Sequence, residues 1–263
     1  MLLAVDVGNS NTSFGVFEGE ELRCELRVGT RRGWTRDEFA ITLERALALR
    51  SYNFEAITAA VLASVVPPVQ RPIVEGLERY VGVEALVVGP GVRTGMPVLY
   101  EPPKDVGADR IVAAIAAHEG YAKGRGVDGG NTAMIVVDFG TATTFDVISP
   151  RPEYLGGAIA PGVGISADAL FQRAARLPRV DVVKPPTVVG RNTVDAIESG
   201  LFFGYVSLVE GMLARIRAEL DWPARVVATG GLARTVAHET TAIDAVDDNL
   251  MLEGLRMIYA RNR

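Results

Sequence analysis

The chain has 263 residues, of which 48% are hydrophobic and 22% are charged, a balance typical of a folded protein with one large or two moderate cores. Its formal net charge of -5 argues against nonspecific nucleic-acid binding, which depends on clustered Lys and Arg. Cys24 is the only cysteine, so neither a disulfide framework nor a cysteine-based metal site is expected. Because Asp6 follows a short apolar start and no apolar run reaches membrane-spanning length, we expect a cytoplasmic protein without a membrane segment.

The first half of the chain alternates apolar runs with helical patterns. Thr35 and Glu38 form a capping-box pattern, which predicts a helix that begins there and ends near Leu49. The expected elements, in order, are strands at 2–7, 13–17 and 22–28, a helix at 35–49, a strand at 57–66, a helix at 73–80 and a strand at 86–88. The order is three strands, helix, strand, helix, strand.

Proline and glycine separate this half from the next. Residues 89–103 predict a loop, residues 108–121 a helix, and the glycine-rich segment 124–130 a domain boundary. We therefore expect domains at 1–123 and 131–263. Within the second, we expect strands at 134–137 and 226–228, and helices at 163–175, 194–220 and 250–259.

A short motif occurs in both halves, each time after an apolar strand. Asp6 aligns with Asp138, Gly8 with Gly140, and Thr12 with Thr144. Such self-similarity indicates a duplicated architecture. We expect an α/β protein made of two ribonuclease-H-like domains that face each other across a cleft.

The two motifs have the chemistry of phosphate-binding turns. Their sequences are DVGNSNT at 6–12 and DFGTATT at 138–144. Glycine lets backbone N–H groups approach a phosphate, the Asn, Ser and Thr side chains add donors, and the acid can hold Mg²⁺ or its waters. Alone, either motif suits a plain hairpin turn equally well; the second copy favours phosphate binding. Residues 228–231 are a third candidate turn, for adenosine, although alone they resemble a strand-to-helix connection.

Asp109 and Arg110 lie at the start of a predicted helix. In the structural interpretation, Asp109 is an acid in the first turn of the helix that pairs with the arginine at the surface. In the functional interpretation, Asp109 accepts a proton from an attacking hydroxyl and Arg110 binds an anionic group. His118 and His238 show no metal-ligand spacing, and no Gly-x-Ser-x-Gly elbow supports a hydrolase.

Taken together, the motifs resemble those of the type III pantothenate kinases, also called the Bvg accessory factor family. The resemblance covers nearly the whole chain. It rests on the segments at 6–12, 63–67, 100–110, 138–144, 156–162, 190–193 and 229–231. It implies the fold of the acetate and sugar kinase, Hsp70 and actin superfamily, and ATP-dependent phosphorylation of pantothenate, the first step of coenzyme A biosynthesis.

The resemblance also implies a role for each matching residue. Asp109 would be the proton acceptor, and Asp138 would bind a monovalent cation, potassium or ammonium. Pantothenate would be held by Tyr100, Gly107, Ala108, Asp109, Arg110 and Thr193. ATP, with Mg²⁺, would be held by Asp6, Val7, Gly8, Asn9, Ser10, Asn11, Thr12, Ser13 and Thr141. The family is typically homodimeric.

Three features depart from the family pattern, and two alternatives remain open. Ser10 replaces a frequent Thr but keeps the hydroxyl, Ala113 replaces a common Asn, and the segment 124–130 is longer than usual. One alternative is another small-molecule kinase of the same fold, which a panel of hydroxyl substrates would distinguish. The other is a nucleotide-binding regulator without catalysis, although a regulator has no need of a base such as Asp109.

Overall fold

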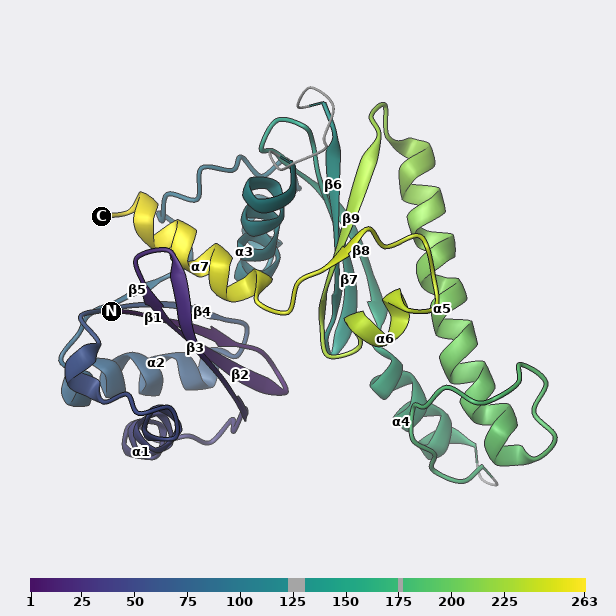
Figure 1. Cartoon of the computed structure of the whole chain (residues 1–263), viewed down its shortest axis with the longest axis horizontal. Coiled ribbons are helices and arrows are strands. Elements are labelled where there is room, and N and C mark those ends of the chain that lie inside the picture. The colour runs from purple at the N-terminus through teal and green to yellow at the C-terminus, as the bar shows by residue number, and fades with distance from the viewer. Residues whose placement is uncertain (123–130, 175–176) are drawn as a thin grey trace. The chain divides into compact units, whose positions relative to one another are not determined.

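The fold is described from a computed structural model over residues 1–122, 131–174 and 177–263. The chain divides into two compact units, of which unit 1 comprises Met1–Ala116 and Asn249–Arg263 and unit 2 comprises Ala117–Asp248. Each unit contains a five-stranded sheet with helices packed on it (Figure 1). The glycine-rich segment at 124–130, expected to be the domain boundary, lies outside the described residues.

The sheet of unit 1 has the strand order β3-β2-β1-β4-β5. Its strands are β1 (Leu2–Val7), β2 (Asn11–Glu18), β3 (Glu21–Gly29), β4 (Ala59–Ser64) and β5 (Ala85–Val87). The first three pair antiparallel, whereas β4 and β5 continue the sheet in parallel beside β1. Parallel strands need a crossover connection, and helices supply it between β3 and β4 and between β4 and β5.

Two layers of helices cover this sheet. They are α1 (Arg36–Ala48), α2 (Pro67–Gly76), α3 (Ala108–Ala117) and α7 (Leu250–Arg261), with short helical turns at Phe54–Ala56, Leu77–Val81 and Pro103–Asp105. Phe39 of α1 and Ile73 of α2 belong to one buried cluster with Phe14 of β2. The next residue, Gly15, points to the opposite face, where a Cβ would lie 3.1 Å from Leu252 of α7. The sheet is therefore buried on both faces.

The sheet of unit 2 repeats the same connectivity, in the order β10-β9-β6-β7-β8. Its strands are β6 (Ala133–Phe139), β7 (Ala142–Ile148), β8 (Tyr154–Pro161), β9 (Ala224–Gly230) and β10 (Ala245–Val246). Again the first three pair antiparallel, and the last two pair in parallel beside the first. This shared topology supports the duplication that the two motifs predict.

The longest helix of unit 2 packs on the core formed by its sheet. The helices are α4 (Val163–Arg173), α5 (Thr193–Glu219) and α6 (Ala233–Ala237), with a π-helical turn at His118–Ala122. Phe202 and Val209 of α5 lie in a buried cluster with Val137 of β6 and Phe145 of β7. Among the described residues, α5 alone is long and apolar enough to span a membrane by composition, and 33% of its most apolar window is buried. Because core helices of soluble proteins pass the same test, its length alone is weak evidence for a membrane segment.

Most of the expected elements are present, although α2 begins at Pro67 rather than near Ile73, and β7, β8, β10 and α6 have no counterpart among the expected elements. The capping box forms as expected. The N–H of Thr35 donates to Glu38 Oε2 at 2.9 Å, and the N–H of Glu38 donates to Thr35 Oγ1 at 3.3 Å. The C-terminal helix α7, expected in the second domain, belongs to unit 1. The reason is its buried apolar side, which packs on β1, β2 and β4.

The alignment of the two motifs also needs a correction of one residue. Asp6 pairs with Ser13, whereas Asp138 pairs with Thr144. The second hairpin is therefore one residue shorter, and Thr12 corresponds to Thr143 rather than to Thr144. Sequence alignment without a gap misses this because it keeps both turns at equal length.

Candidate active site

The first candidate phosphate-binding turn lies between β1 and β2. The N–H of Gly8 donates to the carbonyl of Asn11 at 2.9 Å and closes the turn. A Cβ at Gly8 would lie 3.1 Å from that same oxygen, so glycine suits the position. Asn9, Ser10 and Asn11 are exposed, and the half-buried Asp6 precedes them near the end of β1. The turn thus offers polar groups to solvent beside one carboxylate.

The flanking residues differ in how much they are exposed. Val7 and Thr12 are buried, at 1% and 0% exposure, whereas Ser13 is half-buried. The hydroxyl of Thr12 bonds the hydroxyl of Thr30 at 2.8 Å. The side chains of Val7 and Thr12 therefore pack in the interior. Only the backbone atoms of these two residues can contact a ligand.

Asp109 lies in the first turn of α3, partly removed from solvent. Its Oδ1 accepts the backbone N–H of Arg110 at 2.8 Å. Burial raises the pKa of the Asp109 carboxyl, opposed by that hydrogen bond and by the charge of Arg110. A Cβ at Gly107 would collide with Asp109 Oδ1, so the glycine makes room for the carboxylate. A desolvated carboxylate with a raised pKa is a stronger base than a surface acid.

Arg110 and Tyr100, both expected near Asp109, belong to the same unit as Asp109. Arg110 is buried, at 8% exposure, and Tyr100 is half-buried in the loop before α3. This loop is attached to the C-terminus, because Arg93 N–H donates to Asn262 Oδ1 at 3.0 Å and Asn262 Nδ2 donates to Arg93 O at 2.9 Å. No pattern in the sequence indicates this attachment, which joins residues 169 positions apart.

In unit 2, the Asp138 turn and the third candidate turn meet at one edge of the sheet. The parallel pairing of β6 and β9 places Asp138 beside Thr229, and the N–H of Gly231 donates to Phe139 O at 3.2 Å. Gly230 has a φ of 92°, and a Cβ there would lie 2.6 Å from Asp138 Oδ1 and 2.7 Å from Phe139 O. Only glycine lets the carboxylate lie this close to the backbone.

A helix N-terminus lies against the same turn. The N–H of Gly162, the N-cap of α4, donates to Thr141 O at 3.2 Å. A Cβ at Gly162 would lie 2.7 Å from Gly140 O. Thr141 is exposed, so its side chain is open to a ligand beside the positive end of the helix dipole. The sequence predicts this helix at 163–175 but assigns no ligand to its N-terminus.

Thr193 begins α5 beside a hollow in unit 2. The preceding Asn192 caps the helix, because its Oδ1 accepts the N–H of Asp195 at 2.9 Å. The hollow has a volume of about 830 Å³ and combines apolar walls such as Leu170 and Ile197 with the polar groups of Asn192 and Thr193. A site of mixed polarity and this size can take a small polar organic molecule.

The described residues hold no group of three or more His, Cys, Asp or Glu side chains that could bind a metal ion. His118 is buried with Nε2 3.3 Å from Pro150 O, and His238 is exposed. Asp138 and the carbonyl of Phe139 offer oxygens close together beside Gly230. Oxygens of this kind suit a hard cation, so these residues fit such an ion better than zinc.

Comparison with known proteins identifies the relatives of the chain. A family model described as type III pantothenate kinase matches residues 2–215. The type III pantothenate kinase of Myxococcus xanthus is 52% identical over 262 residues, covering 100% of this chain and 99% of its own.

Two solved structures share the fold at low sequence identity. A Baf family protein from Campylobacter jejuni, described as a transcriptional activator, has a TM-score of 0.60 at 21% identity, with 99% of this chain and 98% of that one covered. An inorganic polyphosphate/ATP-glucomannokinase from an Arthrobacter strain has a TM-score of 0.51 at 12% identity and the same coverages. The chain therefore shares with both structures an α/β fold built of two units, each with a five-stranded sheet and helices.

Proposed function

Because this chain belongs to the type III pantothenate kinase family, whose members phosphorylate pantothenate in the first step of coenzyme A biosynthesis, we propose that it does so with Asp109 as proton acceptor. The observation that carries this role is the raised pKa of Asp109, caused by burial at the start of α3. In its charged form the carboxylate takes the proton of the terminal hydroxyl of pantothenate as that oxygen attacks the γ-phosphorus, and ADP leaves.

The turns at 6–13 and around Thr141 would bind the phosphates of ATP. The exposed donors of Asn9, Ser10 and Asn11 support this role, together with the α4 N-terminus near Thr141. ATP would arrive with Mg²⁺, and Asp6 would hold the ion or its waters. Preorganised donors of this kind stabilise the charge that spreads over the transferred phosphoryl group.

Pantothenate would be held by Tyr100 and by residues 107–110 in unit 1, and by Thr193 in unit 2. Arg110 would bind the carboxylate of pantothenate, because a guanidinium can form two parallel hydrogen bonds with a carboxylate. The burial of Arg110 supports this role, since a desolvated charge gains more from an anionic partner than an exposed one. The hollow beside Thr193 in unit 2 supports a contact between Thr193 and pantothenate.

Asp138 would hold a monovalent cation, potassium or ammonium. The oxygens beside Gly230 support this assignment, because such ions bind carboxylate and carbonyl oxygens. When bound, the cation would offset the charge of Asp138 next to the ATP phosphates. Asp138 itself would fix the ion at the edge of the sheet where Thr141 contacts ATP.

We further propose that the protein acts as a homodimer in the cytoplasm, with no nucleic-acid or membrane partner. Support for a second copy comes from large apolar side chains exposed along α4, α5 and the segment between them, namely Ile165, Leu170, Phe171, Val183, Val188, Val189, Val194 and Leu208. Monomeric proteins rarely leave such groups together at the surface, and a second copy would cover them. Light scattering of the purified protein measures this directly.

The kinase proposal is tested by ATP consumption in potassium buffer with and without pantothenate, and with a panel of other hydroxyl compounds. We expect consumption that depends on pantothenate and is not replaced by sugars. Equal turnover with a sugar would indicate a different kinase of the same fold. ATP binding without turnover on any compound would favour a nucleotide-binding regulator.

A further inference from the structure

Both candidate phosphate-binding turns have a fully buried threonine at the same structural position. Thr12 pairs with Val7 in the first hairpin, and Thr143 pairs with Phe139 in the second. Both threonines have 0% exposure. A buried hydroxyl costs free energy unless it is hydrogen-bonded, so each must have a partner in the protein interior.

In unit 1 the partner is Thr30, which directly follows β3. Its hydroxyl donates to the carbonyl of Gly8 at 2.8 Å and lies 2.8 Å from the hydroxyl of Thr12. Because a hydroxyl has one hydrogen, Thr12 is the donor to Thr30 in this arrangement. The backbone N–H of Thr30 also donates to Ser10 O at 3.0 Å. One residue outside the motif therefore makes three hydrogen bonds to the first turn and its flank.

In unit 2 the partner is Tyr205, which lies in α5. Its hydroxyl bonds the hydroxyl of Thr143 and also the backbone of Val163, at the start of α4. Its ring packs on Phe139, with the two centroids 6.0 Å apart. Tyr205 is 8% exposed, so this network is shielded from water. It joins the hairpin, the α4 N-terminus and α5.

We propose that Thr30 and Tyr205 are positioning residues for ATP, which fix the two phosphate-binding turns through the buried hydroxyls of Thr12 and Thr143. This inference rests on the proposed function, since it assigns the same turns to ATP. Neither residue belongs to a phosphate motif, and they lie 18 and 62 positions along the chain from their threonines.

The physical reason is that the tips of both turns are exposed to solvent, outside the packed interior. Asn9, Ser10 and Asn11 are exposed in the first turn, and Gly140 and Thr141 in the second. Phosphoryl transfer depends on donors held in place before the charge develops, because small displacements of such groups cost much of the rate. A hydrogen bond from the interior to the base of each turn supplies that restraint.

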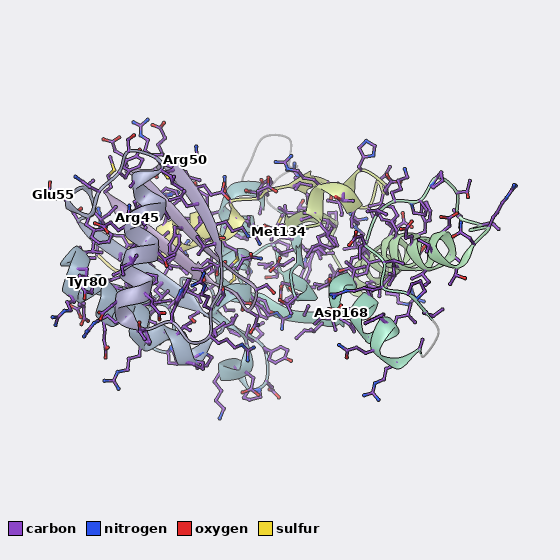
Figure 2. All side chains as sticks on the ribbon, turned by 90° about the horizontal axis from the view of Figure 1, so that it is seen from below. Arg45, Arg50, Glu55, Tyr80, Met134 and Asp168 are labelled. Carbon is purple, nitrogen blue, oxygen red and sulfur yellow. The ribbon has the colours of Figure 1, made fainter. Side chains whose placement is uncertain are left out.

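The test removes each hydroxyl with little change in shape, by Thr30→Val and Tyr205→Phe. Thr30→Ser keeps the hydroxyl and serves as the rescue. Two matched controls lose a hydroxyl of unit 1 away from the turns: Thr42→Val, whose hydroxyl bonds Glu38 O at 2.8 Å, and Tyr80→Phe, whose hydroxyl bonds Asp37 at 2.7 Å. Tyr80 lies at the periphery of unit 1 (Figure 2).

Three readouts separate positioning from general damage: steady-state constants for ATP and for pantothenate, affinity for a non-hydrolysable ATP analogue by calorimetry, and the thermal midpoint. Thr30→Val and Tyr205→Phe should each raise the KM for ATP by about tenfold or more, because each removes two hydrogen bonds at the base of a turn. The KM for pantothenate should stay within about twofold, and Thr30→Ser and both controls should match the wild type.

Wild-type KM for ATP in both variants, or an equal loss in Tyr80→Phe and Thr42→Val, would overturn the proposal. If Thr30→Val does not fold, the proposal is tested by the other two variants. It then requires a raised KM for ATP in Tyr205→Phe and wild-type ATP affinity in Thr30→Ser. If the wild type consumes no ATP with pantothenate, the proposed function is refuted instead. The analogue affinities then still test whether the two residues position a nucleotide.

Discussion

Replacing Asp109 with Asn should abolish most activity and at the same time stabilise the fold. The amide keeps the shape and can still accept the N–H of Arg110, but it cannot take a proton at neutral pH. We expect kcat to fall by about a hundredfold or more, the scale of losing a general base, while ATP binding is largely retained.

The stability effect follows from the sign of the pKa shift. Burial raises the pKa of Asp109 in the folded protein, so the folded state holds this proton more tightly than the unfolded state does. The carboxylate therefore lowers stability once the pH exceeds the folded pKa, and this cost is absent below the unfolded pKa. A neutral Asn avoids the cost, so Asp109→Asn should stabilise the protein near pH 8 by about 0.5–2 kcal/mol, the usual range of a single stabilising substitution.

Thermal unfolding at several pH values, together with initial rates, makes the measurement. The gain of Asp109→Asn over wild type should grow as the pH rises from about 4 to about 8. Asp168→Asn is the control, because Asp168 lies half-buried on α4 (Figure 2) and makes an ion pair with Arg179 at 2.8 Å, away from Asp109 in the sequence. It should change stability by less than about 0.5 kcal/mol. A stability gain that shrinks with rising pH would refute the burial argument for Asp109.

Three further substitutions test the other assignments. Arg110→Ala should reduce the preference for pantothenate over its neutral amide analogue in calorimetric titrations, by a few kcal/mol, about the scale for truncating a buried charged pair; an undiminished preference would place the carboxylate elsewhere. Activity should require potassium or ammonium, and Asp138→Ala should weaken both this dependence and ATP use, whereas full activity in sodium buffer would contradict the cation site. Gly230→Ala should cost about 1–3 kcal/mol in chemical denaturation, because its φ is 92° and a Cβ would lie 2.6 Å from Asp138 Oδ1. Gly231→Ala, with nothing within 4 Å of a Cβ, is the stability control and should cost less; equal losses would remove the argument from close approach.

The sequence was informative where local chemistry determines local structure. Thr35 and Glu38 predict the start of α1 correctly, since a capping box needs only contacts within one turn. The two Asp-x-Gly motifs likewise predict two hairpins, because a strand followed by Gly and small polar residues is self-contained. For the same reason, the order of the elements in the first half could be predicted from hydrophobic periodicity alone.

The features that were missed depend on contacts distant in sequence. No pattern near the C-terminus indicates that Asn262 bonds the backbone of Arg93, or that α7 packs in unit 1. The hydrogen bonds from Thr30 and Tyr205 to the turns could not be predicted from the sequence either, because a single threonine or tyrosine has many possible partners. The unequal length of the hairpins also required the strand register.

The most direct test of the central claim is phosphorus NMR of the reaction of wild type and Asp109→Asn with MgATP and pantothenate in potassium buffer. We expect the wild type to form a phosphomonoester on the terminal hydroxyl of pantothenate together with ADP. We expect Asp109→Asn to form about a hundredfold less product in the same time. No phosphomonoester from the wild type, or equal product from Asp109→Asn, would contradict the claim.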